Sequence, residues 1–479
     1  MSQVKIMMNS KFWLFVLFLA IVSRLSTSIN YYEDIDSLRF ALSAYDYDVL
    51  NNQPHFPGYP IYCFFLSVLL FITNSLALSS SIIGGFAVFL IIYFSQKINY
   101  EIFRNNSIFL FLIIFFNPFI WLMSNRYMPD LLGLSLLVSG FYYLIKTQKD
   151  STDIKNSYML GIMIGLLSGV RISFMPFFIP IFFLLKFRNI KSVISTSILS
   201  FLIWFIPLIY ITDVSELLNT SINDFQGHFY RWGGTVISDN SSFETRFIKV
   251  IESVFADSLG MWWRDRHWIT FINTIFLLPF LIFSIVLFFK KKIYKHKLSL
   301  TVLVCFTAYF LWAFLFQNIV YKPRHLMPFI PLSCFLISFS FEYLKQLIKR
   351  FSIKNILFLI LVPYGLITLK LISQHKTPSA ISQISTHITD SKAENVIIIS
   401  HHLMNYYFSK SITKPTIYLN KKSHQNKSKH YYKNGYRIFS TSKLNEDEYN
   451  LVNFNSFYHN PYVNKLWSNL SVYEYEVIK

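Results

Sequence analysis

The sequence predicts an α-helical membrane protein with many spans, followed by a small α/β domain at its C-terminal end. Three observations lead to this fold class. Of the 479 residues, 53% are hydrophobic and only 14% are charged, whereas soluble domains carry about 25% charged residues. The 51 Phe residues fill long runs that lack both the alternation of a half-buried strand and the polar face of a surface helix. After about residue 373, His, Asn, Lys, Ser and Tyr replace these apolar runs.

The net charge of +19 would suggest nucleic-acid binding in a soluble protein. Here the cations gather in short connectors between apolar runs, where the positive-inside rule places Lys and Arg on the cytoplasmic side. We therefore expect a lipid bilayer as the partner of this chain, and no nucleic acid. The three cysteines lie in apolar runs without metal-ligand spacing, so neither a disulfide framework nor a zinc site is predicted.

The distribution of charge in the connectors predicts the topology. The first apolar run, 12–29, follows two lysines and lacks a small-residue cleavage site, so we expect a retained span with a cytoplasmic N-terminus. The segments 30–58 and 211–267 carry an acidic excess and should face outward. The basic connectors can all face the cytoplasm, and the acidic segments the outside, only if the run 59–76 does not cross the membrane. We therefore expect this run to lie at the outer leaflet or to re-enter it. This gives about 11 transmembrane helices plus one juxtamembrane or re-entrant helix, in the inner (cytoplasmic) membrane, with the C-terminus outside.

Two domains are expected on this basis. The membrane domain covers residues 1–372, and a soluble outside domain covers 373–479. The outside loops of the membrane domain are 30–58, 124–130, 211–267 and 318–326. In the soluble domain we predict a helix at 378–390, strands at 395–400, 414–419, 436–441 and 471–477, and a polar basic loop at 421–433.

Candidate catalytic carboxylates follow the first span and begin a later one. Asp34 and Asp36, with Glu33, lie in YYEDIDSLRFA (31–41). Such residues could simply hydrate a loop, but a carboxylate partly desolvated at the lipid surface has a raised pKa and can act as a general base. Asp130 lies in SNRYMPDLL (124–132), where it could complement a helix dipole or face the first loop.

Candidate substrate-binding residues are cationic or imidazole side chains on the same side. Arg126 shares a connector with Asp130, and His55 lies in the proline-rich turn QPHFPGYPIY (53–62), which could be only a rigid turn at the membrane surface. Arg171 lies between two short apolar runs, where it either snorkels to the surface or contacts a phosphate. The compact patch of Lys322, Arg324 and His325 lies where Lys and Arg should be scarce, and it could hold a phosphate.

Taken together, these segments resemble motifs of the GT-C superfamily of integral-membrane glycosyltransferases, most closely its bacterial dolichyl-phosphate-mannose protein mannosyltransferase type. In chain order they are DIDSLRFA (34–41), HFPGYP (55–60), MPDLL (128–132), GLLSGVRISFMPFFIP (165–180) and PRHLMPFIPL (323–332). The resemblance implies a sugar donor linked to polyprenyl phosphate. It implies that Asp36 is the catalytic carboxylate, with Asp34 as a nearby reserve, and that Asp130 is the acid of the second loop. The chain departs from the family at Ser37, Phe56 and His325, where Glu, Pro and Tyr are common.

We therefore expect an inverting transferase at the outer face of the membrane, in which Asp36 deprotonates an acceptor hydroxyl. The polyprenyl phosphate would leave toward a cationic site made from some of Arg171, Lys322, Arg324 and His55. Asp130 could orient Asp36, bind the acceptor, or join Asp36 on a divalent cation, the one possible cofactor. The acceptor would be a cell-envelope glycolipid, polysaccharide or protein. Two alternatives stay open: a lipid-linked saccharide polymerase or ligase, and a transporter or flippase of polyprenyl lipids.

Overall fold

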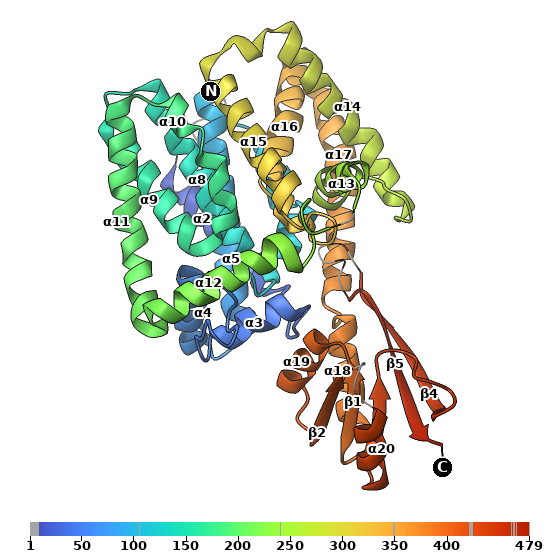
Figure 1. Cartoon of the computed structure of the whole chain (residues 1–479). Helices are drawn as coiled ribbons and strands as arrows, with labels where there is room; N and C mark the ends of the chain where they lie inside the picture. Colours follow the sequence, from blue (N-terminus) through green and yellow to red (C-terminus); the bar gives the residue numbers. More distant parts are fainter. Residues whose placement is uncertain are drawn as a thin grey trace.

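A computed structural model describes residues 9–104, 106–239, 241–347, 350–420, 425–460, 462, 465 and 467–478. Helices form a bundle, and a smaller α/β domain lies at one end of it (Figure 1). Within the described residues, six helices are long and apolar enough to cross a membrane, or up to seven if one bent pair counts as a span. The multi-span helical fold is thus present, whereas the expected count of about 11 spans is not confirmed by length and composition.

The apolar spans are α5 (Leu76–Phe103), α9 (Ile154–Arg171) continued by the 3₁₀ helix η1 (Ile172–Phe178), α11 (Phe187–Thr212), α14 (Trp268–Lys290), α15 (Lys297–Phe316) and most of α17 (Arg350–His375). The bent pair is α6 (Ile108–Phe115) and α7 (Pro118–Asn125), whose axes differ by 50°. Pro118 starts α7 and cannot donate a backbone hydrogen bond, which favours a break at this point. Helices α2 (Ser10–Leu25), α8 (Asp130–Lys149) and α16 (Phe329–Leu347) pack among these spans.

Connectors between helices of the bundle lie close together at one of its ends. Glu101 at the end of α5 lies 3.4 Å from Lys146 and 2.9 Å from Lys149 of α8, and Asn189 of α11 donates to the Ser157 hydroxyl of α9 at 2.9 Å. Several basic connectors therefore meet at one end. The chain's N-terminus lies at that end in Figure 1, while α3 (Ile35–Ser43), α4 (Pro60–Thr73) and the C-terminal domain lie at the other. Which end faces the cytoplasm stays a prediction.

The helix within the run 59–76 is short. At 14 residues, α4 is about 21 Å long, whereas the hydrocarbon core of a bilayer is about 30 Å thick. The turn before α4 contains Gly58, with φ of +87°. A Cβ on Gly58 would lie 2.4 Å from the Tyr47 hydroxyl oxygen, so only glycine fits this turn. The length of α4 agrees with a helix that does not cross.

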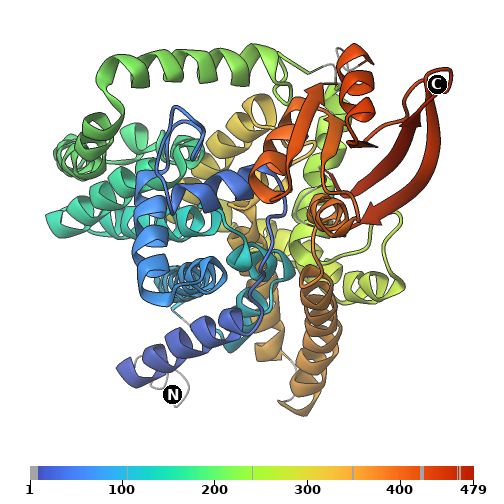
Figure 2. The ribbon, with the colours of Figure 1, turned by 90° about the horizontal axis from the view of Figure 1, so that it is seen from below.

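The segment expected as the outside loop 211–267 contains helices. Helix α12 (Val214–Gln226) crosses one end of the bundle (Figures 1 and 2). It is followed by η2 (Gly227–Arg231), α13 (Phe243–Ile251) and η3 (Glu252–Asp257). Leu218, Ile222 and Phe225 of α12 are exposed, which is typical of a helix that lies in a membrane interface.

The C-terminal domain has a five-stranded sheet with the order β2-β1-β3-β5-β4. Strands β1 (Val396–Ser400), β2 (Thr416–Asn420) and β3 (Arg437–Ser440) are parallel. Strand β5 (Asn469–Val477) pairs antiparallel with β3 and with β4 (Tyr449–Tyr458). The four predicted strands and the predicted helix, α18 (Ala380–Asp390), are present, as is α19 (His402–Ser411), which was not predicted.

Two parts of this domain differ from the sequence-based expectation. The prediction of a polar loop at 421–433 is wrong for the described part of this segment, because residues Gln425–Lys433 form helix α20. Residues 421–424 lie outside the described residues. Tyr431 and Tyr432 pack against the buried core on one face of the sheet, and this contact outweighs the polar composition of the segment. Strand β4 was not predicted because it contains three Asn residues, a type that is depleted in strands, and most of its side chains are exposed.

The C-terminal domain shares a buried core with the acidic segment. Ile35 and Leu38 of α3 pack with Ile384 of α18 and Phe408 of α19, and Figure 2 shows α3 beside the domain. The hydroxyl of Tyr407 donates to the Tyr32 carbonyl at 2.8 Å. The domain therefore helps to fix the position of α3.

Candidate active site

The acidic motif is shaped by the cap of α3. Asp34 is the N-cap residue, and its Oδ1 accepts the backbone N–H of Ser37 at 2.8 Å. The Ser37 hydroxyl accepts the backbone N–H of Asp34 at 2.9 Å, which completes a capping box. Ser37, the residue that departs from the family pattern, therefore has a structural role. The cap places Asp36 in the first turn, where its side chain is only 9% exposed.

Asp36 faces the basic patch expected from the sequence. Its Oδ2 lies 2.8 Å from Lys322 Nζ and 2.5 Å from Arg324 Nη2, both brought there by the short helix η5 (Pro323–Leu326). No hydrogen bond to the other oxygen, Oδ1, is found among the described residues. Burial raises the pKa of Asp36, but Lys322 and Arg324 outweigh it and hold this pKa well below the usual range of a carboxyl. The expectation of a raised pKa is therefore wrong for Asp36, because the cations lie within contact distance.

Arg324 lies at the centre of a charged cluster, called the Asp36 cluster below, whose other members are Asp34, Asp36, Arg126, Asp130, Arg171 and Lys322. Its Nε lies 3.7 Å from Asp130 Oδ1, and its Nη1 lies 3.9 Å from Asp34 Oδ2. With the contact to Asp36, one guanidinium thus faces three carboxylates, which is possible because its donors point in several directions in one plane. Arg324 is 2% exposed, so these contacts take place away from bulk water.

Asp130 holds a second arginine. Its Oδ1 lies 2.9 Å from Arg171 Nη2, and Asp130 is completely buried. The same Arg171 nitrogen lies 3.5 Å from His325 Nδ1, so Arg171 adjoins the basic patch that contains His325. A Cβ on Gly133 would lie 2.6 Å from the Cβ of Arg171, so α8 and Arg171 approach this closely only at a glycine. In this arrangement Asp130 orients arginines and has no surface that an acceptor could reach.

Arg126 ties the acidic motif together. Its Nε lies 2.6 Å from Glu33 Oε2, and its Nη2 lies 2.8 Å from Asp34 Oδ2. Glu33 Oε1 lies 2.9 Å from His375 Nε2, at the end of α17. Burial alone would raise the pKa of Glu33, but the opposite effect of Arg126 and His375 is larger and lowers this pKa to about 2. Sequence reasoning did not assign a role to Glu33 or His375, because a pairing 342 residues apart leaves no local signal.

His55 lies beside the cluster without joining its ion pairs. Its Nε2 lies 3.1 Å from the Tyr59 hydroxyl, and its buried Nδ1 has no hydrogen bond to a described residue. Burial lowers the pKa of His55 to about 3, so the ring is neutral near pH 7. A neutral imidazole can donate to or accept from a substrate hydroxyl.

Comparisons with known proteins give the fold. No family model and no curated protein matches this sequence. Among solved structures, ArnT from Cupriavidus metallidurans bound to undecaprenyl phosphate aligns with a TM-score of 0.59 and 10% identity, over 96% of this chain and 97% of that one. Its apo form gives a TM-score of 0.56 and 9% identity over the same shares. This chain has the GT-C fold.

A second GT-C neighbour is the oligosaccharyltransferase of Archaeoglobus fulgidus, solved in complex with Zn and sulfate. It aligns with a TM-score of 0.52 and 12% identity, over 89% of this chain and 68% of that one. The GT-C resemblance inferred from the order of short motifs is therefore confirmed at the level of the fold. At these identities the likeness assigns no residue a role, so the candidate site rests on the geometry above.

The carboxylates of the candidate site do not fit a divalent cation. No group of three or more His, Cys, Asp or Glu side chains within the described residues could hold a metal ion. Asp34, Asp36 and Asp130 each lie within 4 Å of an Arg or Lys nitrogen. These positive side chains would repel a metal cation placed among the carboxylates. We therefore assign no step to a metal.

Proposed function

We propose that this GT-C protein transfers a sugar from a polyprenyl-phosphate donor to a cell-envelope acceptor at the outer face of the cytoplasmic membrane, with inversion. The observation that carries the proposal is the divided role of the Asp36 carboxylate. One oxygen holds Lys322 and Arg324, while the other has no hydrogen bond to a described residue. A base and a cationic leaving-group site thus lie side by side. A structural neighbour bound to undecaprenyl phosphate supports a lipid phosphate as the donor carrier.

In the proposed reaction, Asp36 Oδ1 accepts the proton of the acceptor hydroxyl as that oxygen attacks the anomeric carbon. The bond between the anomeric carbon and the phosphate oxygen breaks, and its electron pair leaves with the polyprenyl phosphate. Lys322 and Arg324 stabilise the negative charge that develops on this phosphate. Because attack and departure occur on opposite faces of the sugar, the anomeric configuration inverts.

The ion pairs also connect donor binding with the strength of the base. Before the donor binds, Lys322 and Arg324 contact Asp36 and keep its pKa low. A donor phosphodiester carries one negative charge, as Asp36 does, and competes with Asp36 for these cations; the second charge that develops as the sugar leaves strengthens this competition. As they turn toward the phosphate, Asp36 loses part of its stabilisation and becomes a stronger base. Asp130 and Arg126 then serve as positioning residues, since they hold Arg171, Arg324 and the acidic motif in place.

Mass analysis of cell-envelope glycans tests this proposal and separates it from its alternatives. Cells that make the wild-type protein should carry a glycan with a pentose or hexose increment that is absent from cells lacking the protein and from cells making Asp36→Asn. Full activity of Asp36→Asn would instead favour a polymerase or ligase that relies on arginines. An unchanged glycan pool with altered distribution of polyprenyl lipids across the membrane would favour a transporter.

A further inference from the structure

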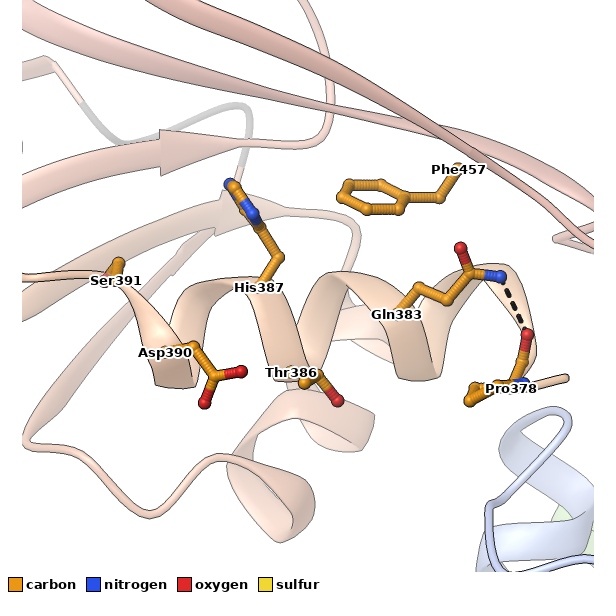
Figure 3. Close-up of a pocket in the computed structure, with 7 residues that line it drawn as sticks. All are labelled: Pro378, Gln383, Thr386, His387, Asp390, Ser391 and Phe457. Atoms are coloured by element: carbon orange, nitrogen blue, oxygen red, sulfur yellow. Dashed lines mark hydrogen bonds between the residues drawn. The ribbon is translucent and has the colours of Figure 1, made fainter.

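A hollow of about 430 Å³ lies in the C-terminal domain, between α18 and β4. Figure 3 shows its lining, and none of the residues of the Asp36 cluster belongs to it. Its size falls in the range of about 300–1,000 Å³ of small-molecule sites. The lining residues are Pro378, Gln383, Thr386, His387, Asp390, Ser391 and Phe457.

One face of α18 forms the floor of this hollow. Gln383, Thr386, His387 and Asp390 follow the spacing of one helix face. The opposite face of α18, with Ile381, Ile384 and Ile388, is buried in the core that the domain shares with α3. The polar residues that line the hollow are therefore not needed to attach the domain to the membrane part.

An aromatic ring from β4 forms the opposite wall. The Phe457 ring centroid lies 5.5 Å from that of His387, and Figure 3 shows the two rings near each other above α18. Asn455 points to the same side of β4 as Phe457, and its Nδ2 lies 3.5 Å from His387 Nε2. Gln383 Nε2 donates to the carbonyls of Pro378 at 2.7 Å and Tyr458 at 3.1 Å. These two bonds fix the amide, and its Oε1 makes no hydrogen bond to a described residue.

The chemistry of the lining points to one ligand class. An aromatic ring, an imidazole, an amide oxygen and hydroxyl groups offer both an apolar surface and directed hydrogen bonds. The lining residues include no Lys or Arg, and Asp390 would repel a phosphate or carboxylate. A fully apolar ligand would cover these polar groups without pairing them, which costs free energy. We propose that this hollow binds a neutral saccharide, whose C–H face lies on Phe457 and whose hydroxyls bond to Gln383, His387 and Thr386.

The position of the hollow indicates the length of the acceptor, and this step rests on the proposed function. The hollow lies on the polar face of α18, whereas α3, the helix that carries Asp36, belongs to the core on the opposite, apolar face of α18. A helix with its side chains is about 10–12 Å across, so a single sugar unit cannot occupy both places. The acceptor would therefore be an extended glycan, held by one part in the hollow while another part presents its hydroxyl to Asp36.

Saturation-transfer NMR on the full-length protein in nanodiscs tests saccharide binding directly. The probes are the neutral trisaccharides of glucose, mannose, galactose and N-acetylglucosamine, with glucose 6-phosphate as a charged control. We expect at least one trisaccharide to bind and Phe457→Ala to weaken it about tenfold, the effect of losing one aromatic contact of about 1.4 kcal/mol. Tyr458→Ala is the matched control, because Tyr458 is the next residue on the other face of β4 and is exposed.

A second variant covers the case in which Phe457→Ala does not fold. Thr386 is exposed at the floor of the hollow, so Thr386→Trp should fill it and abolish binding without disturbing the core. Asp36→Asn should bind the trisaccharide like the wild type, which separates this inference from the proposed catalysis. Absence of binding by all four trisaccharides, stronger binding of glucose 6-phosphate, or unchanged affinity in Thr386→Trp would overturn the proposal.

Discussion

Asp36 is the residue on which the proposed chemistry depends, because its Oδ1 has no hydrogen bond to a described residue and can accept a proton. Asp36→Asn keeps the size of the side chain and removes the base. We predict that turnover falls by about 10²–10⁴-fold, the usual contribution of a positioned base. Binding of polyprenyl phosphate should persist, since Lys322 and Arg324 remain. A radiolabelled transfer assay and a lipid-phosphate binding assay measure the two effects separately.

The matched control for this variant is Asp34→Asn. Asn is as good an N-cap residue as Asp, so α3 should keep its start while the charge facing Arg126 is lost. We expect a smaller loss of turnover than in Asp36→Asn. Wild-type turnover in Asp36→Asn would discard the base assignment, and a larger defect in Asp34→Asn would move the role two residues back.

Arg324 should act on the donor in its ground state as well as in the transition state. Arg324→Ala removes a charge-assisted contact to the phosphate, worth about 1.5–3 kcal/mol. We therefore predict that the affinity for polyprenyl phosphate falls by about 10- to 150-fold. Arg324→Lys keeps the charge but loses the planar contacts to three carboxylates, so its affinity for polyprenyl phosphate should lie between those of the wild type and Arg324→Ala. Unchanged lipid-phosphate affinity in Arg324→Ala would place the phosphate elsewhere.

The lowered pKa of Glu33 predicts a pH-dependent stability. Folding lowers this pKa to about 2, below its unfolded value of about 4.3, so the folded state favours the charged carboxylate. This stabilisation, about 3 kcal/mol, is present above pH 5 and is lost as the pH falls toward 2. Glu33→Gln should lower the melting temperature of the detergent-solubilised protein at pH 7, and the gap to wild type should close near pH 2–3. A gap independent of pH would show that Glu33 is not paired as described.

At the scale of elements, α4 tests the topology. Its 14 residues are too few to span about 30 Å of hydrocarbon, so both of its ends should face the same side. Single cysteines introduced by Phe56→Cys and Leu78→Cys should both react with an impermeant thiol reagent added outside. The native Cys63, Cys305 and Cys334 are buried and give a low background. Labelling of the two positions from opposite sides would contradict this topology.

The elements also show what sequence patterns could and could not predict. Strands β1, β2, β3 and β5 follow from short β-branched or aromatic runs, because these residues suit a pleated surface. Helix α20 could not be predicted, since its formation depends on tyrosines that pack on a distant sheet. At the site, the motifs indicated that Asp36, Asp130, Arg171 and Arg324 lie near one another. Which carboxylate pairs with which cation is set by packing between distant helices, so that part required the structure.

At the scale of the whole molecule, the C-terminal domain and the GT-C membrane part form a continuous structure around the acidic motif. Glu33 contacts His375 at the end of α17, and Lys465 lies 2.6 Å from Glu252 of η3. Composition alone predicted a membrane part and a soluble part, because their contents of apolar residues differ so strongly. It could not predict that α3 shares its core with the C-terminal domain. Under the proposed function, we therefore expect the domain to affect the use of the acceptor.

The most direct test of the central claim is donor turnover by the purified protein in proteoliposomes. Polyprenyl-phosphate sugars and nucleotide sugars are supplied separately, each with a cell-envelope extract as the acceptor, and the released carrier is measured. We predict that wild-type protein releases free polyprenyl phosphate, that Asp36→Asn releases about 10²–10⁴-fold less, and that neither consumes a nucleotide sugar. Consumption of nucleotide sugars, or equal release of polyprenyl phosphate by wild type and Asp36→Asn, would contradict the proposed mechanism.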